Sequence, residues 1–304
     1  MVFSSVADVQ AKLEAASYIP SVEIATVVFI AMATQKPVLI EGPAGVGKTE
    51  LAKAVASSLD RKLIRLQCYE GLDEAKALYE WEYAKQLLYT QMVRDRINTV
   101  IAGAVSLNDA VDRIAAQEDA FFSERFIQPR PLLQAILSTE PVVLLIDEVD
   151  KSDPEFEAFL LELLSDFQVT IPELGTRKPI TIPFVVLTSN NYRDMSDALK
   201  RRCLHLYIDY PSPEREMEII KLRLPGIEDR LLESLIRTVV RLRSMDLKKK
   251  PCISESLDWA RALLALGIRD LTPEAVDATL NVVLKYHADV RMVRQALGAL
   301  VKSP

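Results

Sequence analysis

A glycine-rich segment that ends in a lysine and a threonine carries the clearest chemistry in this sequence. Residues 42–49, Gly-Pro-Ala-Gly-Val-Gly-Lys-Thr, have the spacing G-x-x-x-x-G-K-S/T that is typical of phosphate binding. Glycines accept positive φ and let backbone N–H groups come close to an oxyanion, while Lys48 adds a mobile positive charge. We expect these residues to bind a nucleotide through its phosphates: Gly42, Pro43, Ala44, Gly45, Val46, Gly47, Lys48, Thr49 and Glu50.

Two carboxylates follow the apolar run Val142-Val-Leu-Leu-Ile146, which predicts a buried strand. In an open α/β sheet, ligands bind beyond the carboxyl ends of the strands, so Asp147 and Glu148 should face the phosphate site. We expect Asp147 and the Thr49 hydroxyl to hold Mg²⁺, and Glu148 to polarise the water that attacks the γ-phosphate. The alternative is a strand that ends in ordinary solvated acids.

A third apolar run, Phe184–Thr188, is followed by Ser189, Asn190 and Asn191. An amide side chain at this place could orient the attacking water. An asparagine after a strand is more often a turn former, because asparagine tolerates left-handed backbone. The residues alone therefore leave both interpretations of Asn190 open.

Short apolar runs alternate with helical patterns from about residue 21 to residue 210, which is typical of a mostly parallel sheet covered by helices. Leu51, Val55 and Leu59 recur at helical spacing after the glycines, so the phosphates would lie at a helix N-terminus. The five expected strands are Pro37–Glu41, Leu63–Gln67, Val142–Asp147, Phe184–Thr188 and His205–Asp209.

The pattern changes at the segment Pro211-Ser-Pro213. Pro213 and Pro273 each follow a hydroxyl residue and begin a helical pattern, which is a helix-start signal. We therefore expect an α/β nucleotide-binding domain at residues 1–211 and a small all-helical domain at residues 212–304.

Two segments exceed what a minimal nucleotide-binding fold needs. Residues 69–94 are expected to form a long helix directly after the second strand. Residues 169–182 alternate β-branched side chains around a turn at Leu174 and Gly175, which predicts a β-hairpin.

The composition limits the classes of function. The chain has 304 residues, 49% of them hydrophobic, and can bury a large core. A net charge of −6 makes nucleic acid an unlikely main partner, and three scattered cysteines with two histidines indicate neither a disulfide framework nor a zinc site. Because we find no membrane span and no secretory signal, we expect a cytoplasmic protein.

The order of these motifs resembles that of AAA+ ATPases, in which a P-loop core is followed by a helical lid domain. The segment Ala198-Leu-Lys-Arg-Arg-Cys203 has its counterpart there, and the inserted helix and hairpin resemble the MoxR branch. Four stretches are similar to CoxD-type proteins, which accompany molybdenum-containing carbon monoxide dehydrogenases: Tyr69–Asp73, Arg130–Leu133, Ile146–Lys151 and Ser254–Leu263.

The resemblance implies roles for further residues. Asn190 corresponds to the first sensor, and Arg202, or alternatively Arg201, to the arginine finger that reaches the γ-phosphate of a neighbouring subunit. Many MoxR proteins have Ser-Pro-Arg where this chain has Ser254-Glu-Ser256, so the second-sensor arginine is missing and Arg261 is its candidate replacement. Each of these arginines could instead be an ordinary surface residue.

The sequence thus predicts an enzyme, an ATPase whose cofactors are ATP and Mg²⁺. By resemblance, we expect a homo-oligomeric ring, a hexamer, that acts as a MoxR-type chaperone on a metalloenzyme client together with a von Willebrand factor A-domain protein. Two other functions stay open: a nucleic-acid-handling motor with a related core, and a scaffold that binds ATP but hydrolyses it poorly. The intact Glu148 disfavours the scaffold.

Overall fold

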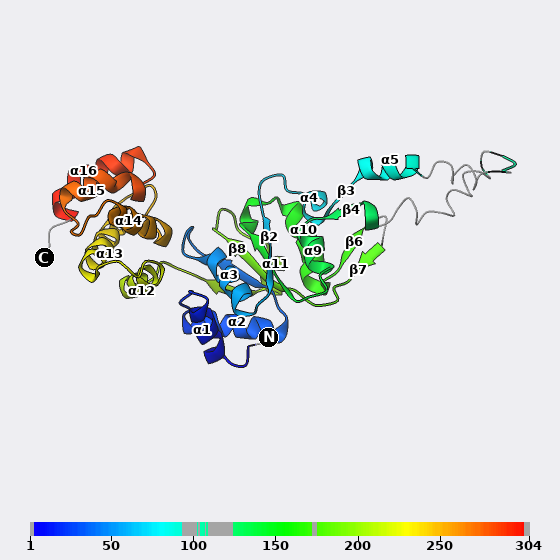
Figure 1. Cartoon of the computed structure of the whole chain (residues 1–304), viewed down its shortest axis with the longest axis horizontal. Coiled ribbons are helices and arrows are strands. Elements are labelled where there is room, and N and C mark those ends of the chain that lie inside the picture. The colour runs from blue at the N-terminus through cyan, green and yellow to red at the C-terminus, as the bar shows by residue number, and fades with distance from the viewer. Residues whose placement is uncertain are drawn as a thin grey trace.

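The centre of the molecule is a five-stranded parallel sheet. The computed structural model describes residues 3–92, 102, 104–106, 108, 124–171 and 175–300 (Figure 1). The strand order is β2-β5-β8-β1-β9, with every neighbouring pair parallel. The strands are β1 (Val38–Glu41), β2 (Lys62–Gln67), β5 (Val142–Asp147), β8 (Phe184–Ser189) and β9 (Leu204–Tyr207). The predicted α/β fold with a parallel sheet between helices is confirmed.

Helices cover both faces of this sheet. On β5, Val143 and Leu145 belong to the hydrophobic cluster under α1, α2 and α3, whereas Leu144 and Ile146 belong to the cluster under α9, α10 and α11. Because β5 is buried on both faces, it is a continuous apolar run rather than an alternating one. The six helices are α1 (Val6–Ala15), α2 (Val22–Thr34), α3 (Lys48–Ser58), α9 (Pro131–Ile136), α10 (Pro154–Asp166) and α11 (Asp197–Arg202).

Five helices follow β9 and form a hydrophobic core of their own, which we call the C-terminal helical region (Figure 1). They are α12 (Pro213–Arg223), α13 (Asp229–Ser244), α14 (Ile253–Ala265), α15 (Pro273–Val283) and α16 (His287–Leu300). The hydroxyl of Ser212 caps α12 by accepting from the N–H of Arg215, and that of Thr272 caps α15 by accepting from the N–H of Ala275. The helix starts predicted from the two prolines are therefore confirmed. None of the described helices is long and apolar enough to cross a membrane.

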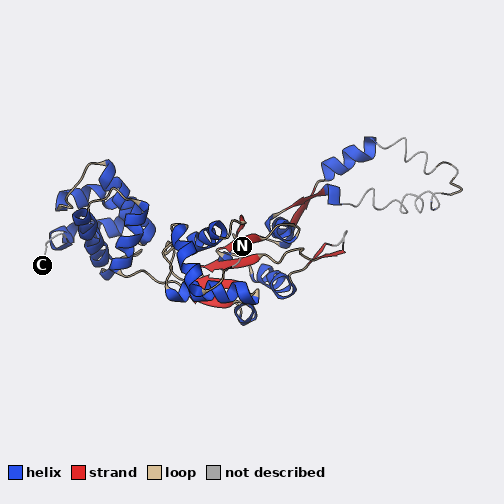
Figure 2. Ribbon diagram, turned by 60° about the horizontal axis from the view of Figure 1, so that its bottom comes forward, coloured by secondary structure: helices blue, strands red, loops and turns tan. Residues whose placement is uncertain are grey.

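The first inserted segment is not one helix. After β2 the chain forms α4 (Glu74–Leu78), the short strand β3 (Tyr79–Trp81) and α5 (Tyr83–Met92). The prediction of one long helix was wrong because β3 pairs antiparallel with β4 (Ile127–Pro129), a contact between distant parts of the sequence. The end of the predicted helix, residues 93 and 94, lies outside the described residues. The β3–β4 pair and α5 project away from the central sheet (Figures 1 and 2).

The second inserted segment contains the antiparallel pair that the sequence predicted. Strand β6 (Val169–Ile171) pairs with β7 (Gly175–Arg177). Gly175 is the first residue of β7, and its φ of +74° places it in the left-handed region. Leu174, the other residue of the predicted turn, lies outside the described residues.

Candidate nucleotide-binding site

The loop between β1 and α3 has a backbone suited to an anion. Gly42, Gly45 and Gly47 have φ of +146°, +76° and +99°, a region that costs other residues about 1–2 kcal/mol. Helix α3 begins at Lys48 with Gly47 as its N-cap. Its first N–H groups have no intrahelical acceptor, and the helix dipole favours negative charge at this end.

Two of these glycines have no room for a side chain. A Cβ on Gly42 would lie 2.0 Å from the carbonyl oxygen of Ile208, in the segment after β9. A Cβ on Gly45 would lie 2.0 Å from the Sγ of Cys252, which is the N-cap of α14. The phosphate loop therefore touches both the C-terminal helical region and the segment that leads to it.

Lys48 is buried among acceptors of the protein. It is 6% exposed, and its ammonium donates to the carbonyl oxygens of Gly42 and Pro43 and to Oδ1 of Asn190, each at 2.7 Å. Burial lowers the pKa of Lys48, although the negative charge of Asp150 and of two neighbouring carboxylates opposes the shift. Because three N–H donors serve three acceptors, an incoming phosphate would replace at least one of them.

Asp147 and Thr49 bring oxygen atoms together beside the phosphate loop. Asp147 is 2% exposed, and its Oδ1 accepts from the hydroxyls of Thr49 (3.0 Å) and Thr188 (2.5 Å). Hydroxyl and carboxylate oxygens are the hard ligands that Mg²⁺ prefers, and Mg²⁺ commonly takes one or two protein ligands plus phosphate oxygens and waters. The donor set of these two residues therefore fits Mg²⁺.

Glu148 is held by donors on both of its carboxylate oxygens. Its backbone is left-handed, with φ of +56°, and its N–H donates to the Thr188 hydroxyl at 2.9 Å. Oε1 accepts from Nδ2 of Asn190 at 3.0 Å. Oε2 accepts from Nε2 of Gln67 at 2.8 Å and from the ammonium of Lys151 at 2.7 Å. Since Asn190 also contacts Lys48, the structure brings the predicted base and sensor together with the phosphate loop.

Asp150 is a site residue that the sequence reasoning missed. It is 1% exposed, and its Oδ2 accepts from the backbone N–H groups of Asn190 (3.0 Å) and Tyr192 (2.8 Å). Its Oδ1 has no hydrogen-bond partner among the described residues. Asp150 thus fixes the turn that carries Asn190. The only sequence signal was a third acid close behind Asp147 and Glu148.

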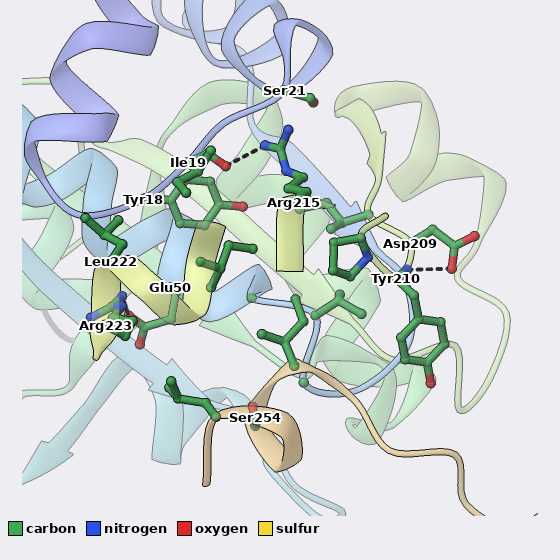
Figure 3. Close-up of a pocket in the computed structure, with 18 of the residues that line it drawn as sticks. Tyr18, Ile19, Ser21, Glu50, Asp209, Tyr210, Arg215, Leu222, Arg223 and Ser254 are labelled. Atoms are coloured by element: carbon green, nitrogen blue, oxygen red, sulfur yellow. Dashed lines mark hydrogen bonds and ion pairs between the residues drawn. The ribbon is translucent and has the colours of Figure 1, made fainter. Parts of the chain in front are cut away.

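A cavity of about 660 Å³ opens beside the phosphate loop (Figure 3). Its walls come from the segment before α2, the loop with the start of α3, the segment after β9, and helices α12 and α14. This volume is in the range of small-molecule sites. Aromatic and apolar side chains contribute to the lining, as a nucleobase requires: Tyr18, Ile24, Tyr210, Ile219, Leu222 and Leu257.

Arg261, the predicted replacement for the second sensor, lines this cavity, and so do Arg215 and Arg223 of α12. Arg215 donates to the carbonyl oxygen of Ile19 at 2.6 Å, and Arg223 donates to Oε2 of Glu50 at 3.1 Å (Figure 3). The helical region therefore supplies three cations to the cavity, of which the sequence reasoning found one.

Arg201 and Arg202 lie elsewhere. Both are exposed at the end of α11 and do not line the cavity. Arg202 donates through Nε to the Ser165 hydroxyl and through NH1 to the carbonyl oxygen of Ala198 at 3.0 Å. Neither arginine belongs to the nucleotide site of its own chain.

The contact between Gly45 and Cys252 gives a testable prediction. Gly45→Ala is expected to weaken ATP binding about tenfold, because the new methyl group must push the phosphate loop and α14 apart, as overpacking does elsewhere. Titration with a fluorescent ATP analogue would measure the affinity.

Gly71→Ala is the matched control, since Gly71 has the similar φ of +79° but nothing within 4 Å of the place that its Cβ would take. It carries the backbone strain without the collision. Adding Cys252→Ala to Gly45→Ala removes the sulfur and should recover part of the affinity. Equal losses in the Gly45 and Gly71 variants would contradict the packing explanation.

The chain is similar to several known proteins. Residues 37–203, more than half of the chain, match the AAA domain of the dynein-related subfamily. An uncharacterised protein of Staphylococcus saprophyticus is 26% identical over 243 residues, which are 78% of each chain. The gas vesicle ATPase GvpN of Haloferax mediterranei is 25% identical over 279 residues, 88% of this chain and 74% of GvpN. A mutant of Thermotoga maritima RuvB superposes with a TM-score of 0.48 at 18% identity, over 91% of this chain and 70% of RuvB.

Proposed function

Because the chain belongs to the dynein-related subfamily of AAA domains and is an AAA ATPase, we propose that it couples Mg²⁺-dependent ATP hydrolysis to the remodelling or maturation of a partner protein. One observation carries the hydrolytic part of the proposal. The phosphate loop, the Asp147–Glu148 strand end and Asn190 come from three separate strand ends and form one hydrogen-bonded group beside a nucleotide-sized cavity.

The geometry supports a division of labour among these residues. The loop and Lys48 bind the phosphates, and Thr49 with Asp147 would hold Mg²⁺, which neutralises negative charge on phosphate oxygens. Glu148 takes a proton from the attacking water, since within the described part of the chain its Oε1 has one donor, Asn190, and keeps a lone pair for the water. Asn190 orients the same water, and its Oδ1 accepts a hydrogen bond from Lys48 on the phosphate loop.

In this proposal the C-terminal helical region is the lid of the nucleotide site, beginning at residue 212. Ser256, at the expected place of the second-sensor arginine, is fully buried and donates to the carbonyl oxygen of Cys252 at 3.1 Å. A side chain in that position is directed into the protein, so another residue must reach the nucleotide. Arg261 lines the cavity and is our candidate.

AAA proteins are typically oligomeric. We propose a ring, a hexamer by resemblance, in which Arg202 acts on the nucleotide of the neighbouring subunit. Support comes from the position of Arg202, which is exposed and does not line the cavity of its own chain. A cation supplied in trans makes hydrolysis depend on assembly.

The proposed partners are a von Willebrand factor A-domain protein and a metalloenzyme client. The support is the resemblance to MoxR and CoxD-type sequences, together with the first inserted segment, whose β3–β4 pair and α5 project away from the central sheet (Figures 1 and 2). Exposed aromatic and apolar side chains on α5, such as Tyr83 (74%) and Leu87 (61%), suit contact with another protein.

Affinity capture from the native organism tests this function. Glu148→Gln loaded with Mg²⁺-ATP should trap the engaged state, so we expect enrichment of a von Willebrand factor A-domain protein and of metalloenzyme subunits. Lys48→Ala is the matched bait, since it should bind nucleotide poorly and lose these partners. Capture of nucleic-acid-processing enzymes instead, sensitive to nuclease treatment, would contradict the proposed client class.

A further inference from the structure

A network of side chains at the end of β2 joins the two carboxylates of the site. Arg65 donates to Oδ2 of Asp147 from Nε at 2.9 Å and from NH2 at 2.5 Å. The same NH2 donates to Oε1 of Gln67 at 2.5 Å. Gln67 in turn donates from Nε2 to Oε2 of Glu148 at 2.8 Å. A continuous path of hydrogen bonds therefore runs from Asp147 to Glu148 through two residues of β2.

Arg65 fixes the direction of the Gln67 amide. A guanidinium has only hydrogen-bond donors, so it can bond only to the oxygen end of that amide. The nitrogen end must then face Glu148, whose ionised carboxylate has only acceptors. A reversed amide would place N–H against guanidinium and oxygen against carboxylate, losing both bonds. Without Arg65, the Glu148 carboxylate would still select the nitrogen end, but the amide oxygen would lose the donor that Arg65 supplies, so the amide would be held from one end only.

The same arrangement occurs at the other oxygen of Glu148. Lys48, also a donor-only cation, faces Oδ1 of Asn190 at 2.7 Å, and Nδ2 of Asn190 faces Oε1 of Glu148 at 3.0 Å. Gln67 and Lys151 occupy both lone-pair positions of Oε2. Among the described residues, Oε1 accepts from Asn190, which leaves one lone pair of Oε1 for the attacking water.

The sheet register explains why these residues meet. β2 pairs with β5 so that Gln67 is opposite Asp147 and Arg65 is opposite Leu145. Arg65 and Gln67 are two residues apart and lie on one face of the strand. Asp147 is 2% exposed, so its buried charge anchors the guanidinium, which is 49% exposed.

We propose that Arg65 is a positioning residue for ATP hydrolysis, which acts on Glu148 through the amide of Gln67. This inference rests on the proposed hydrolytic role of Glu148. It predicts a change in the chemical step, because Arg65 is not among the residues that line the nucleotide cavity.

Replacing Arg65 with methionine keeps an apolar stem and removes the donors. We expect kcat for ATP at saturating Mg²⁺ to fall about tenfold. This is the low end of the losses seen when a residue that orients a functional side chain, without itself touching the substrate, is replaced. The dissociation constant of a fluorescent ATP analogue should change less than about threefold, so the effect appears in kcat. Arg65→Lys should recover much of the rate, since one nitrogen contacts both Asp147 and Gln67 in the structure.

Gln67→Ala interrupts the path and leaves every hydrogen bond of the Asp147 carboxylate in place. In the Gln67→Ala background, Arg65→Met should lower kcat no further, because the amide that links Arg65 to Glu148 is already absent. Lys62→Met is the control, an exposed cation on the opposite face of β2 that loses the same charge. Thermal unfolding of each variant shows which assay temperatures keep it folded.

Three results would overturn the inference: equal rates for the Arg65→Met and Lys62→Met variants, a raised kcat, or additive losses in the double variant. Failure of the proposed function itself looks different. In that case wild-type protein would not release phosphate, or Glu148→Gln would be as active as wild type.

Discussion

Replacing Glu148 with glutamine is expected to reduce ATP turnover by at least about a hundredfold while ATP binding stays near that of the wild type. Glutamine has the same size and keeps an oxygen for the bond from Asn190, but it cannot take up the proton of the attacking water. The phosphate loop is untouched. Phosphate release measured beside equilibrium binding of a fluorescent ATP analogue would separate the two effects.

Lys48→Ala provides the contrast. It removes the ammonium that bonds Gly42, Pro43 and Asn190, so binding as well as turnover should fall. The assignment of Glu148 as the base would be lost if its glutamine variant turned over ATP at a near-normal rate. If both variants lost binding equally, the separation of roles would be wrong.

Arg202→Ala is expected to reduce turnover about a thousandfold in the assembled protein, the lower range for an arginine supplied to a neighbour's γ-phosphate. Arg201→Ala should have a much smaller effect. Ser165→Ala is a further control, since it removes the hydroxyl that accepts from Arg202 but leaves the guanidinium in place. A large loss in the Arg201 variant with an active Arg202 variant would transfer the role to Arg201.

Mixed assemblies test whether this arginine acts between subunits. With random equal mixing of Arg202→Ala and Glu148→Gln protomers, about one interface in four combines an intact glutamate with an intact arginine. Turnover should then exceed that of either parent. Mixed oligomers, verified by differently tagged protomers, that show no recovery would place the finger elsewhere.

Local sequence patterns predicted the phosphate loop and the carboxylate at the end of β5, because both depend on residues adjacent in the sequence. The phosphate loop follows β1 and begins α3, and Asp147 follows β5, because strand ends and glycine turns are encoded by neighbouring residues. The β3 strand was missed, since Tyr79–Trp81 is extended only through pairing with Ile127–Pro129. A pattern with helical character was overridden by a partner distant in sequence.

The supporting residues could not be identified in the same way. Arg65 and Gln67 have the alternation of an ordinary half-exposed strand, and their contacts with Asp147 and Glu148 follow from the β2–β5 register. No sequence motif marks Cys252, although its sulfur occupies the space that a side chain at position 45 would need. Such contacts depend on which strands and helices become neighbours, which the sequence patterns did not specify.

The close contact between Gly42 and Ile208 has a mechanical consequence. The N–H of Ile208 donates to the carbonyl oxygen of Glu41 at 2.8 Å, so the root of the phosphate loop and the root of the C-terminal helical region are tied together. If the C-terminal helical region rotates relative to the sheet, this tie would be the fixed point of the rotation, and α15 and α16 lie far from it (Figure 1). A small rotation about that point becomes a displacement that grows with distance, so those two helices would transmit most of the movement to whatever contacts them.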